Sequence, residues 1–162
     1  MIIHPFPPIY DKNSRVLILG SFPSVKSREQ QFFYGHPQNR FWKVISAVFS
    51  KPLPHNIDEK RHLLLSCGVA LWDVVYSCDV SGSSDSTIKN VVPNDILAIL
   101  EASDIRHIFV NGKTAEKLYN KYIKSKTCIE AICLPSTSPA NAVKKTDDLI
   151  KDWQKVFHAT KG

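Results

Sequence analysis

The sequence lacks the residue patterns that hold metals and disulfide frameworks. It has only four cysteines in 162 residues, and none of them belongs to a C-x-x-C pair. Zinc and iron–sulfur sites depend on such spacings, so we expect no metal site. This cysteine usage also favours a reducing, intracellular setting. Two of the four flank a strand-like run and are expected in or near the core, namely Cys128 and Cys133.

Long apolar segments are missing as well. No apolar stretch approaches the 18 or so residues of a membrane-spanning helix. Residues 1–10 contain no basic region followed by an apolar run, so no signal peptide is predicted. The chain has no internal repeat, linker or low-complexity tract. We therefore expect a single domain over residues 1–162, without membrane contact and located in the cytoplasm.

The charge of the chain is basic but does not by itself identify a partner. The formal net charge is +6, apolar residues make up 43% and charged residues 22% of the chain. This composition is that of an ordinary globular protein, and the length suffices for a core without disulfides. A polyanionic partner is compatible with the charge. The alternative is a mildly basic protein that binds no nucleic acid.

Segments typical of buried strands alternate with segments of helical periodicity. Short apolar runs predict strands at residues 15–20, 69–75, 106–111 and 129–134. Helices are expected at residues 39–49 and 57–67, after Asn94 as N-cap, after Gly112, and from Ser138 and Pro139 onward. The alternation predicts an α/β fold, a three-layer sandwich with a central, mainly parallel four-stranded sheet and helices on both faces.

In such open sheets, ligands bind outside the carboxyl ends of the strands. The residues at these ends are Gly20–Pro23, Asp73–Val74, Asn111–Gly112 and Leu134–Ser136. The glycine-rich signatures of phosphate-binding loops and dinucleotide-binding sites do not follow the first strand. The site is therefore expected at this edge of the sheet, without the two common nucleotide motifs.

Three features near this edge each have a structural and a functional interpretation. Phe32, Phe33 and Tyr34 form either a stacking platform or a loop packed on the core. Asn39 is placed to cap a helix, and a residue at a helix start can also face a pocket. For His36, the alternative to a place in the site is a position in a surface loop. Hydroxyls and free N–H groups in residues 134–141 suit a phosphate, the alternative being capping by Ser138.

Several motifs in chain order resemble the uracil-DNA glycosylase superfamily. The run from Tyr34 to Ile45 contains His-Pro-Gln-Asn-Arg-Phe-Trp-Lys-Val-Ile and is similar to the mismatch-specific thymine/uracil glycosylases. Gly20-Ser21-Phe22-Pro23-Ser24 is closer to the DNA-deoxyinosine glycosylase branch, which removes hypoxanthine. Residues 84–89, 94–95 and 135–141 also match that branch. The resemblance covers about residues 5 to 158 and is carried by the combination of motifs.

Two departures from the uracil enzymes affect the expected substrate. Uracil-specific members carry Asp, and mismatch-specific members Asn, where this chain has Phe22, which cannot position a water. In the deoxyinosine branch the Asn of His-Pro-x-Asn takes this role, and it is Asn39 here. Leu134 replaces the His or Asn that holds a pyrimidine carbonyl. The resemblance thus implies release of hypoxanthine rather than of uracil.

The resemblance implies a monofunctional glycosylase that flips a deaminated base out of the DNA and hydrolyses its N-glycosidic bond without a metal or organic cofactor. The expected partner is double-stranded DNA, with single-stranded DNA as a second candidate, and the expected protein is a monomer associated with the nucleoid. The expected catalytic residues are Asn39 and His36. The expected base-binding residues are Ser21, Phe22, Phe33, Tyr34 and Asp73. The expected DNA-binding residues are Gly112, Lys113, Ser136, Thr137, Ser138, Ala140 and Asn141.

Other functions fit the same residues. A uracil or G:T/U mismatch-specific glycosylase of the same superfamily is the nearest alternative, because substrate specificity varies within a fold. A non-catalytic protein that binds damaged DNA would keep the pocket but release no base. An unrelated α/β enzyme acting on a small nucleotide would lack salt-dependent affinity for DNA.

Overall fold

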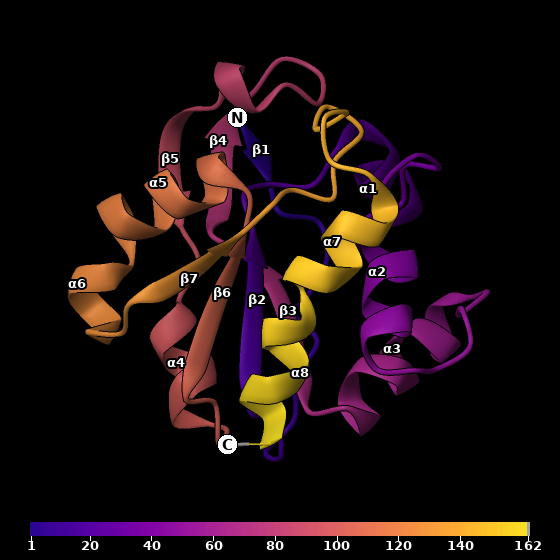
Figure 1. Cartoon of the computed structure of the whole chain (residues 1–162). Helices are drawn as coiled ribbons and strands as arrows, with labels where there is room; N and C mark the ends of the chain where they lie inside the picture. The colour runs from indigo at the N-terminus through magenta and orange to yellow at the C-terminus, as the bar shows by residue number, and fades with distance from the viewer. Residues whose placement is uncertain (162) are drawn as a thin grey trace.

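The computed structural model describes residues 1–161 and is built around a four-stranded parallel sheet (Figure 1). The strands are β2 (Val16–Gly20), β3 (Val69–Asp73), β6 (His107–Asn111) and β7 (Ala131–Leu134). They are arranged in the order β3-β2-β6-β7, and every neighbouring pair is parallel. The central parallel sheet predicted from the sequence is confirmed.

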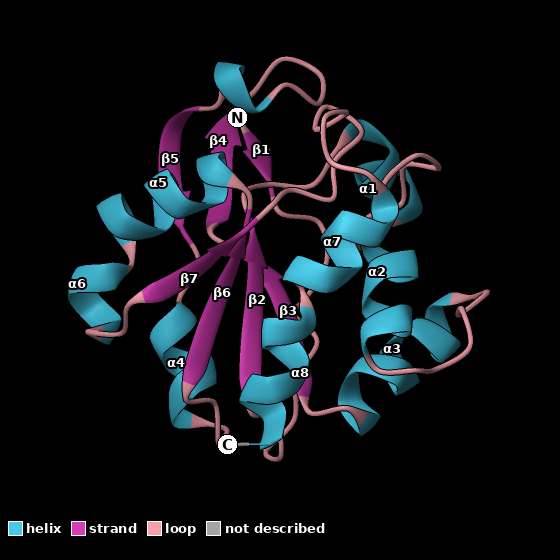
Figure 2. Ribbon diagram, in the orientation of Figure 1, coloured by secondary structure: helices cyan, strands magenta, loops and turns pink. Residues whose placement is uncertain are grey.

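Both faces of this sheet are covered by helices, as Figure 2 shows. Successive residues of β2 alternate between the two cores: Ile18 packs into the cluster on one face and Leu17 into the cluster on the other. The first face is covered by α2 (Phe41–Val48), α3 (Ile57–Ser66), α7 (Thr146–Asp152) and α8 (Gln154–Lys161). The opposite face is covered by α4 (Ile96–Glu101) and α5 (Lys113–Tyr122), and α6 (Lys124–Thr127) packs beside these two helices. The three-layer arrangement is therefore confirmed.

A second, antiparallel sheet was not predicted. It consists of β1 (Ile2–Ile3), β4 (Val75–Asp79) and β5 (Lys89–Pro93), in the order β1-β4-β5. A short 3-10 helix, η1 (Asp85–Thr87), precedes β5. The expected single strand over residues 69–75 is wrong at its end, because the chain leaves the parallel sheet at Val74 and starts β4.

Asn94 stabilises this change of direction and does not cap α4. Its Nδ2 donates to the carbonyl oxygens of Asp73 at 2.8 Å and Val75 at 3.2 Å. The cap of α4 is Asp95, whose Oδ1 accepts from the N–H of Ala98 at 3.2 Å. The cap therefore lies one residue after the predicted position. The amide of Asn94 instead pairs with backbone carbonyls at the break between β3 and β4, which would otherwise be buried without partners.

The last helix also begins later than predicted. It starts at Thr146 rather than at Ser138 and Pro139, and residues 138–145 form a loop. The guanidinium of Arg40 donates to the carbonyl oxygens of Lys144 at 2.6 Å and Asn141 at 2.9 Å. Carbonyls held by a side chain in this way do not need helical hydrogen bonds, which explains the loop. The predicted buried stripe of Leu149, Trp153 and Val156 is confirmed, although it is shared by α7 and α8.

The structure differs from the sequence predictions in three smaller ways: an additional helix, the exposure of a cysteine and the start of one helix. The expected loop over residues 21–38 contains α1 (Val25–Gln30), whose N-cap is Ser24. Cys128 is exposed, so its expected place in or near the core is wrong. The helix expected from residue 39 starts at Phe41. Within residues 1–161, no helix has the length and apolar character needed to cross a membrane.

Candidate active site

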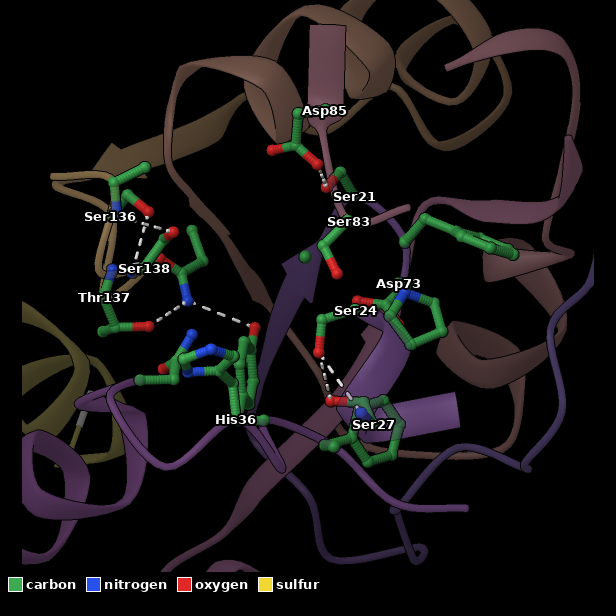
Figure 3. A pocket seen from close by; sticks show the side chains of 18 of the residues that line it. Ser21, Ser24, Ser27, His36, Asp73, Ser83, Asp85, Ser136, Thr137 and Ser138 are labelled. Carbon is green, nitrogen blue, oxygen red and sulfur yellow. Dashed lines mark hydrogen bonds between the residues drawn. The ribbon is translucent and has the colours of Figure 1, made fainter. Parts of the chain in front are cut away.

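A cavity of about 340 Å³ opens at the carboxyl ends of the parallel strands, where the topology predicts a site. Its size falls in the range of small-ligand pockets. Gly20, Asp73 and Asn111 line it from the ends of β2, β3 and β6. The loop after β7, α1 and the segment before α2 complete the wall, and Figure 3 shows their side chains converging on one space.

Most of the residues predicted for the site meet in this cavity, although they come from distant parts of the sequence. Its lining includes Ser21, Phe22, Phe33, Tyr34, His36, Asn39, Asp73, Ser136, Thr137, Ser138 and Ala140. Three predicted DNA-binding residues do not line it, namely Gly112, Lys113 and Asn141. The lining residues outside the predicted set include Ser24, Ser27, Ser83, Asp85 and Asn111.

Asp73 lies on the cavity wall and is paired with a histidine from the N-terminal segment. Its Oδ2 lies 2.7 Å from Nε2 of His4, and both side chains are almost completely buried. Nδ1 of His4 lies 2.9 Å from the carbonyl oxygen of Phe6. The sequence held no signal for this pair, because 69 positions separate the two residues.

Tyr34 presents its hydroxyl near Asp73. It has a left-handed backbone with φ of 54°, which directs its ring onto Phe41, and the two rings are stacked with centroids 4.2 Å apart. The hydroxyl accepts a hydrogen bond from Nδ2 of Asn111 at 3.2 Å. Burial raises the pKa of Tyr34 far above its usual value, and the negative charge of Asp73 adds to this shift. The phenol therefore stays neutral and keeps a proton to donate.

The two phenylalanines before Tyr34 belong mainly to the core. Phe32 and Phe33 are buried, and the backbone oxygen of Phe33 accepts a hydrogen bond from Nε1 of Trp42 at 3.1 Å. The alternative of a loop packed on the core is thus correct for both rings. Phe33 still contributes to the cavity wall. Because Phe41 already covers one face of the Tyr34 ring, only the other face can contact a ligand.

Asn39 lines the cavity but is not the N-cap of α2 that the sequence predicted; that position is taken by Arg40. Oδ1 of Asn39 accepts from the N–H of Phe41 at 2.9 Å, at the start of α2. The amide NH₂ group of Asn39 has no partner among residues 1–161. Nδ1 of His36 accepts from the N–H of Gln38 at 3.1 Å. The proton of a neutral His36 ring is therefore on Nε2, where it can serve as a donor.

A second carboxylate reaches the cavity from the loop before β5. Oδ1 of Asp85 accepts from the hydroxyl of Ser21 at 2.9 Å. Partial enclosure raises the pKa of Asp85, the Ser21 hydrogen bond lowers it, and the charge of Asp73 raises it further. The loop is tied to α1, since Arg28 donates to the carbonyl oxygen of Gly82 at 2.6 Å. Asp73 and Asp85 thus form a pair of carboxylates beside one cavity.

The loop after β7 is fixed to the end of β6. Oδ1 of Asn111 accepts from the N–H of Thr137 at 3.1 Å, and its Nδ2 donates to the hydroxyl of Thr137 at 3.0 Å. Gly112 has φ of +98°, and a side chain there would press on Ser136, 3.1 Å away. This close contact and the positive φ explain why residue 112 is a glycine. Lys113 follows it as the first residue of α5.

Comparison with known proteins fits this architecture. Residues 7–157 match the model of the Uracil DNA glycosylase superfamily. The chain belongs to this superfamily. It is 33% identical, over 97% of its length and 99% of the relative's, to a hypoxanthine DNA glycosylase from Methanosarcina acetivorans. A hypoxanthine DNA glycosylase from Methanosarcina barkeri is 32% identical, over 67% of this chain and 70% of that relative.

A solved structure supports the same relation. The solution NMR structure of a protein from Methanosarcina acetivorans, described as a candidate uracil DNA glycosylase, superposes with a TM-score of 0.83. It has 30% sequence identity and covers 99% of this chain and 100% of its own. As a superfamily member, the chain therefore has the fold that its motifs predicted. The roles of the individual cavity residues remain predictions.

Proposed function

We propose that the protein is a monofunctional DNA glycosylase that releases hypoxanthine from deoxyinosine in double-stranded DNA. The observation that carries this proposal is the cavity in which Asn39, Tyr34 and Asp73 meet, in a chain similar over nearly its full length to a hypoxanthine DNA glycosylase. A base inside a duplex cannot reach such a cavity, so the nucleotide must rotate out of the stack first.

The reaction breaks the bond between the sugar carbon C1′ and N9 of the base. Both electrons of this bond go to the base, a water oxygen bonds to C1′, and the proton that this water loses passes to the departing base, directly or through solvent. The amide of Asn39 is placed to orient this water, but an amide is a weak base. The site must therefore act mainly by stabilising the departing base, to which the neutral Tyr34 hydroxyl and Nε2–H of His36 can donate hydrogen bonds.

The proposed DNA contacts surround the mouth of the cavity. Ser136, Thr137 and Ser138 line it from the loop that Arg40 and Asn111 hold in place. Hydroxyl and backbone N–H groups are common phosphate ligands, and the net charge of +6 favours a polyanion. Lys113 is the expected cation on the neighbouring edge. We expect affinity for DNA to fall steeply with salt concentration.

Duplex oligonucleotides with a single lesion test the proposal. Each would contain one deoxyinosine, deoxyuridine or deoxyxanthosine, and abasic sites would be detected by alkaline cleavage after single-turnover incubation. We expect hypoxanthine to be released faster than uracil. Faster release of uracil would support the alternative uracil or mismatch-specific glycosylase. Binding of the lesion duplex without any abasic product would support a non-catalytic damage-binding protein and refute the proposal.

Two further expectations accompany this function. We predict that the protein acts as a monomer, because one chain supplies every wall of the cavity described above. We also predict a cytoplasmic, nucleoid-associated location, where the DNA of the proposed substrate would be found. Sedimentation of the protein alone and with DNA would check the first prediction, and imaging of a tagged chain would check the second.

A further inference from the structure

His4 does not line the cavity but lies behind its wall, where its ring pairs with Asp73. Its side chain is 2% exposed, and the rings of four residues surround it: Phe6, Phe22, Phe33 and Trp72. The backbone N–H of His4 donates to the carbonyl oxygen of Tyr76 at 2.6 Å. With Nδ1 at the carbonyl oxygen of Phe6 and Nε2 at Asp73, the imidazole is held at both nitrogens. A buried polar ring held so firmly fixes the carboxylate beside it.

The hydrogen bonds of His4 determine where protons can be. The carbonyl oxygen of Phe6 can only accept, so Nδ1 of His4 must carry a hydrogen. The separation of 2.7 Å between Nε2 and Oδ2 of Asp73 requires one proton between them. Either the imidazolium donates to a carboxylate, or the carboxyl group donates to a neutral ring. In both arrangements the other oxygen of Asp73, Oδ1, carries no hydrogen and can only accept.

Oδ1 of Asp73 faces the cavity. Among residues 1–161 no donor is paired with it, and it is not one of the enclosed polar atoms that lack a partner. A side chain at Gly20 would run into both Oδ1 and the hydroxyl of Tyr34. These two groups therefore lie close to each other beside Gly20, on the wall of the cavity.

An oxygen that can only accept, placed opposite the ring nitrogen N1 of a purine or N3 of a pyrimidine, distinguishes deaminated bases from their parents. Hypoxanthine carries a hydrogen on N1, whereas adenine has a lone pair there. Uracil and cytosine differ in the same way at N3. We propose that His4 is a positioning residue that keeps Asp73 an acceptor, so that the site admits the ring N–H created by deamination and rejects the parent base. This inference rests on the proposed glycosylase function.

Substitution of His4 tests the proposal against a role in packing alone. His4→Phe keeps an aromatic ring among its aromatic neighbours but offers no hydrogen to Asp73, whose Oδ1 is then free to carry a proton. His4→Gln fits the rings less well but retains an N–H donor. His62→Phe is the matched control, because His62 is exposed on α3. Single-turnover release from deoxyinosine and deoxyadenosine duplexes would be measured, together with melting temperatures.

We expect His4→Phe to slow hypoxanthine release by about tenfold or more, because the acceptor is no longer fixed. His4→Gln should retain more of the rate than His4→Phe, and His62→Phe should match the unsubstituted protein. A packing role predicts the reverse order for the two His4 variants, and that result would overturn the proposal. If the unsubstituted protein releases no base at all, the glycosylase function itself fails, which is a different outcome.

A second pair of variants at Asp73 keeps the test decisive if His4→Phe does not fold. In Asp73→Asn the amide can donate from Nδ2 to neutral His4 and leave its oxygen as the acceptor at the cavity. Asp73→Leu removes the acceptor at similar size. We expect Asp73→Asn to release hypoxanthine at least about tenfold faster than Asp73→Leu. Equal rates in the two folded variants would show that an acceptor at this position does not matter.

Discussion

The amide of Asn111 donates a hydrogen bond to the hydroxyl of Tyr34 at 3.2 Å and so joins two walls of the cavity. The same side chain accepts from the N–H of Thr137 and donates to its hydroxyl. Asn111 ends β6, Tyr34 precedes α2, and Thr137 belongs to the loop after β7. One residue at the end of a central strand therefore fixes the relative positions of the proposed base-binding and DNA-binding segments.

Asn111→Ala should damage both stability and activity. It leaves the buried N–H and hydroxyl of Thr137 and the hydroxyl of Tyr34 without this partner, which should lower the free energy of unfolding by about 1–3 kcal/mol. Hypoxanthine release should slow by about tenfold, because a displaced loop would no longer orient the DNA correctly at the cavity. Urea denaturation and single-turnover assays would measure these effects. Asn120→Ala, at an exposed position of α5, is the control and should change neither; equal behaviour of both variants would contradict the prediction.

Asn39→Ala should nearly abolish base release while the protein still folds. The loss of the hydrogen bond that the N–H of Phe41 donates to Oδ1 should lower the free energy of unfolding by about 1 kcal/mol. Asn39→Ser separates this structural effect from catalysis, because a serine hydroxyl can also accept from the backbone N–H two residues on but is shorter and has no amide. Both variants should lose activity, and only Asn39→Ala should lose stability. Full base release by either variant would show that Asn39 does not position the water.

The central sheet and the position of the site could be predicted from local patterns. The run Val16–Gly20 is apolar throughout because both faces of β2 are buried, and parallel strands bring their carboxyl ends to one edge. Asn39 and Tyr34 were found because they follow this strand within a continuous motif. These inferences need only residues that are near in sequence, or a general rule of topology.

What the sequence did not reveal depends on contacts between distant residues. The loop before α7 exists because Arg40 binds carbonyl oxygens about 100 positions away, which local capping rules cannot anticipate. The link of His4 to the cavity depends on its contact with Asp73, 69 positions away. Asn94 resembles a helix cap in sequence, but the strand break beside it uses its amide instead. In each case a polar side chain has a partner that only the fold supplies.

Gly20→Ala should impair catalysis more than folding. A methyl group at Gly20 would collide with Oδ1 of Asp73 and press on the hydroxyl of Tyr34 at 3.0 Å, so both groups must move. We expect base release to slow by about a hundredfold, since small displacements of positioned groups have effects of this size. Gly82→Asn is the control, because the space around Gly82 is open and Asn tolerates its positive φ of 60°. A Gly20→Ala variant with an unchanged release rate would show that these two groups are not needed in their present positions.

Val143 should fill the space that a flipped base leaves in the duplex. It is 92% exposed, three positions after Ala140 on the cavity wall, and Arg40 holds the carbonyl oxygens on either side of it at Asn141 and Lys144. An apolar side chain presented on a fixed loop suits insertion between base pairs, as apolar wedges of other DNA-binding proteins do.

Val143→Ser should therefore leave the free energy of unfolding within about 0.5 kcal/mol of its original value, because the side chain makes no core contact. Release of hypoxanthine from a duplex should slow by about tenfold, whereas release from a single strand should hardly change, since no stack has to be held open there. Parallel single-turnover assays on both forms of the same oligonucleotide would measure the difference. Val92→Ser, on the exposed side of β5, serves as the control. Equal slowing on duplex and single strand would assign Val143 to general DNA binding, because a wedge acts only where bases are stacked in a duplex.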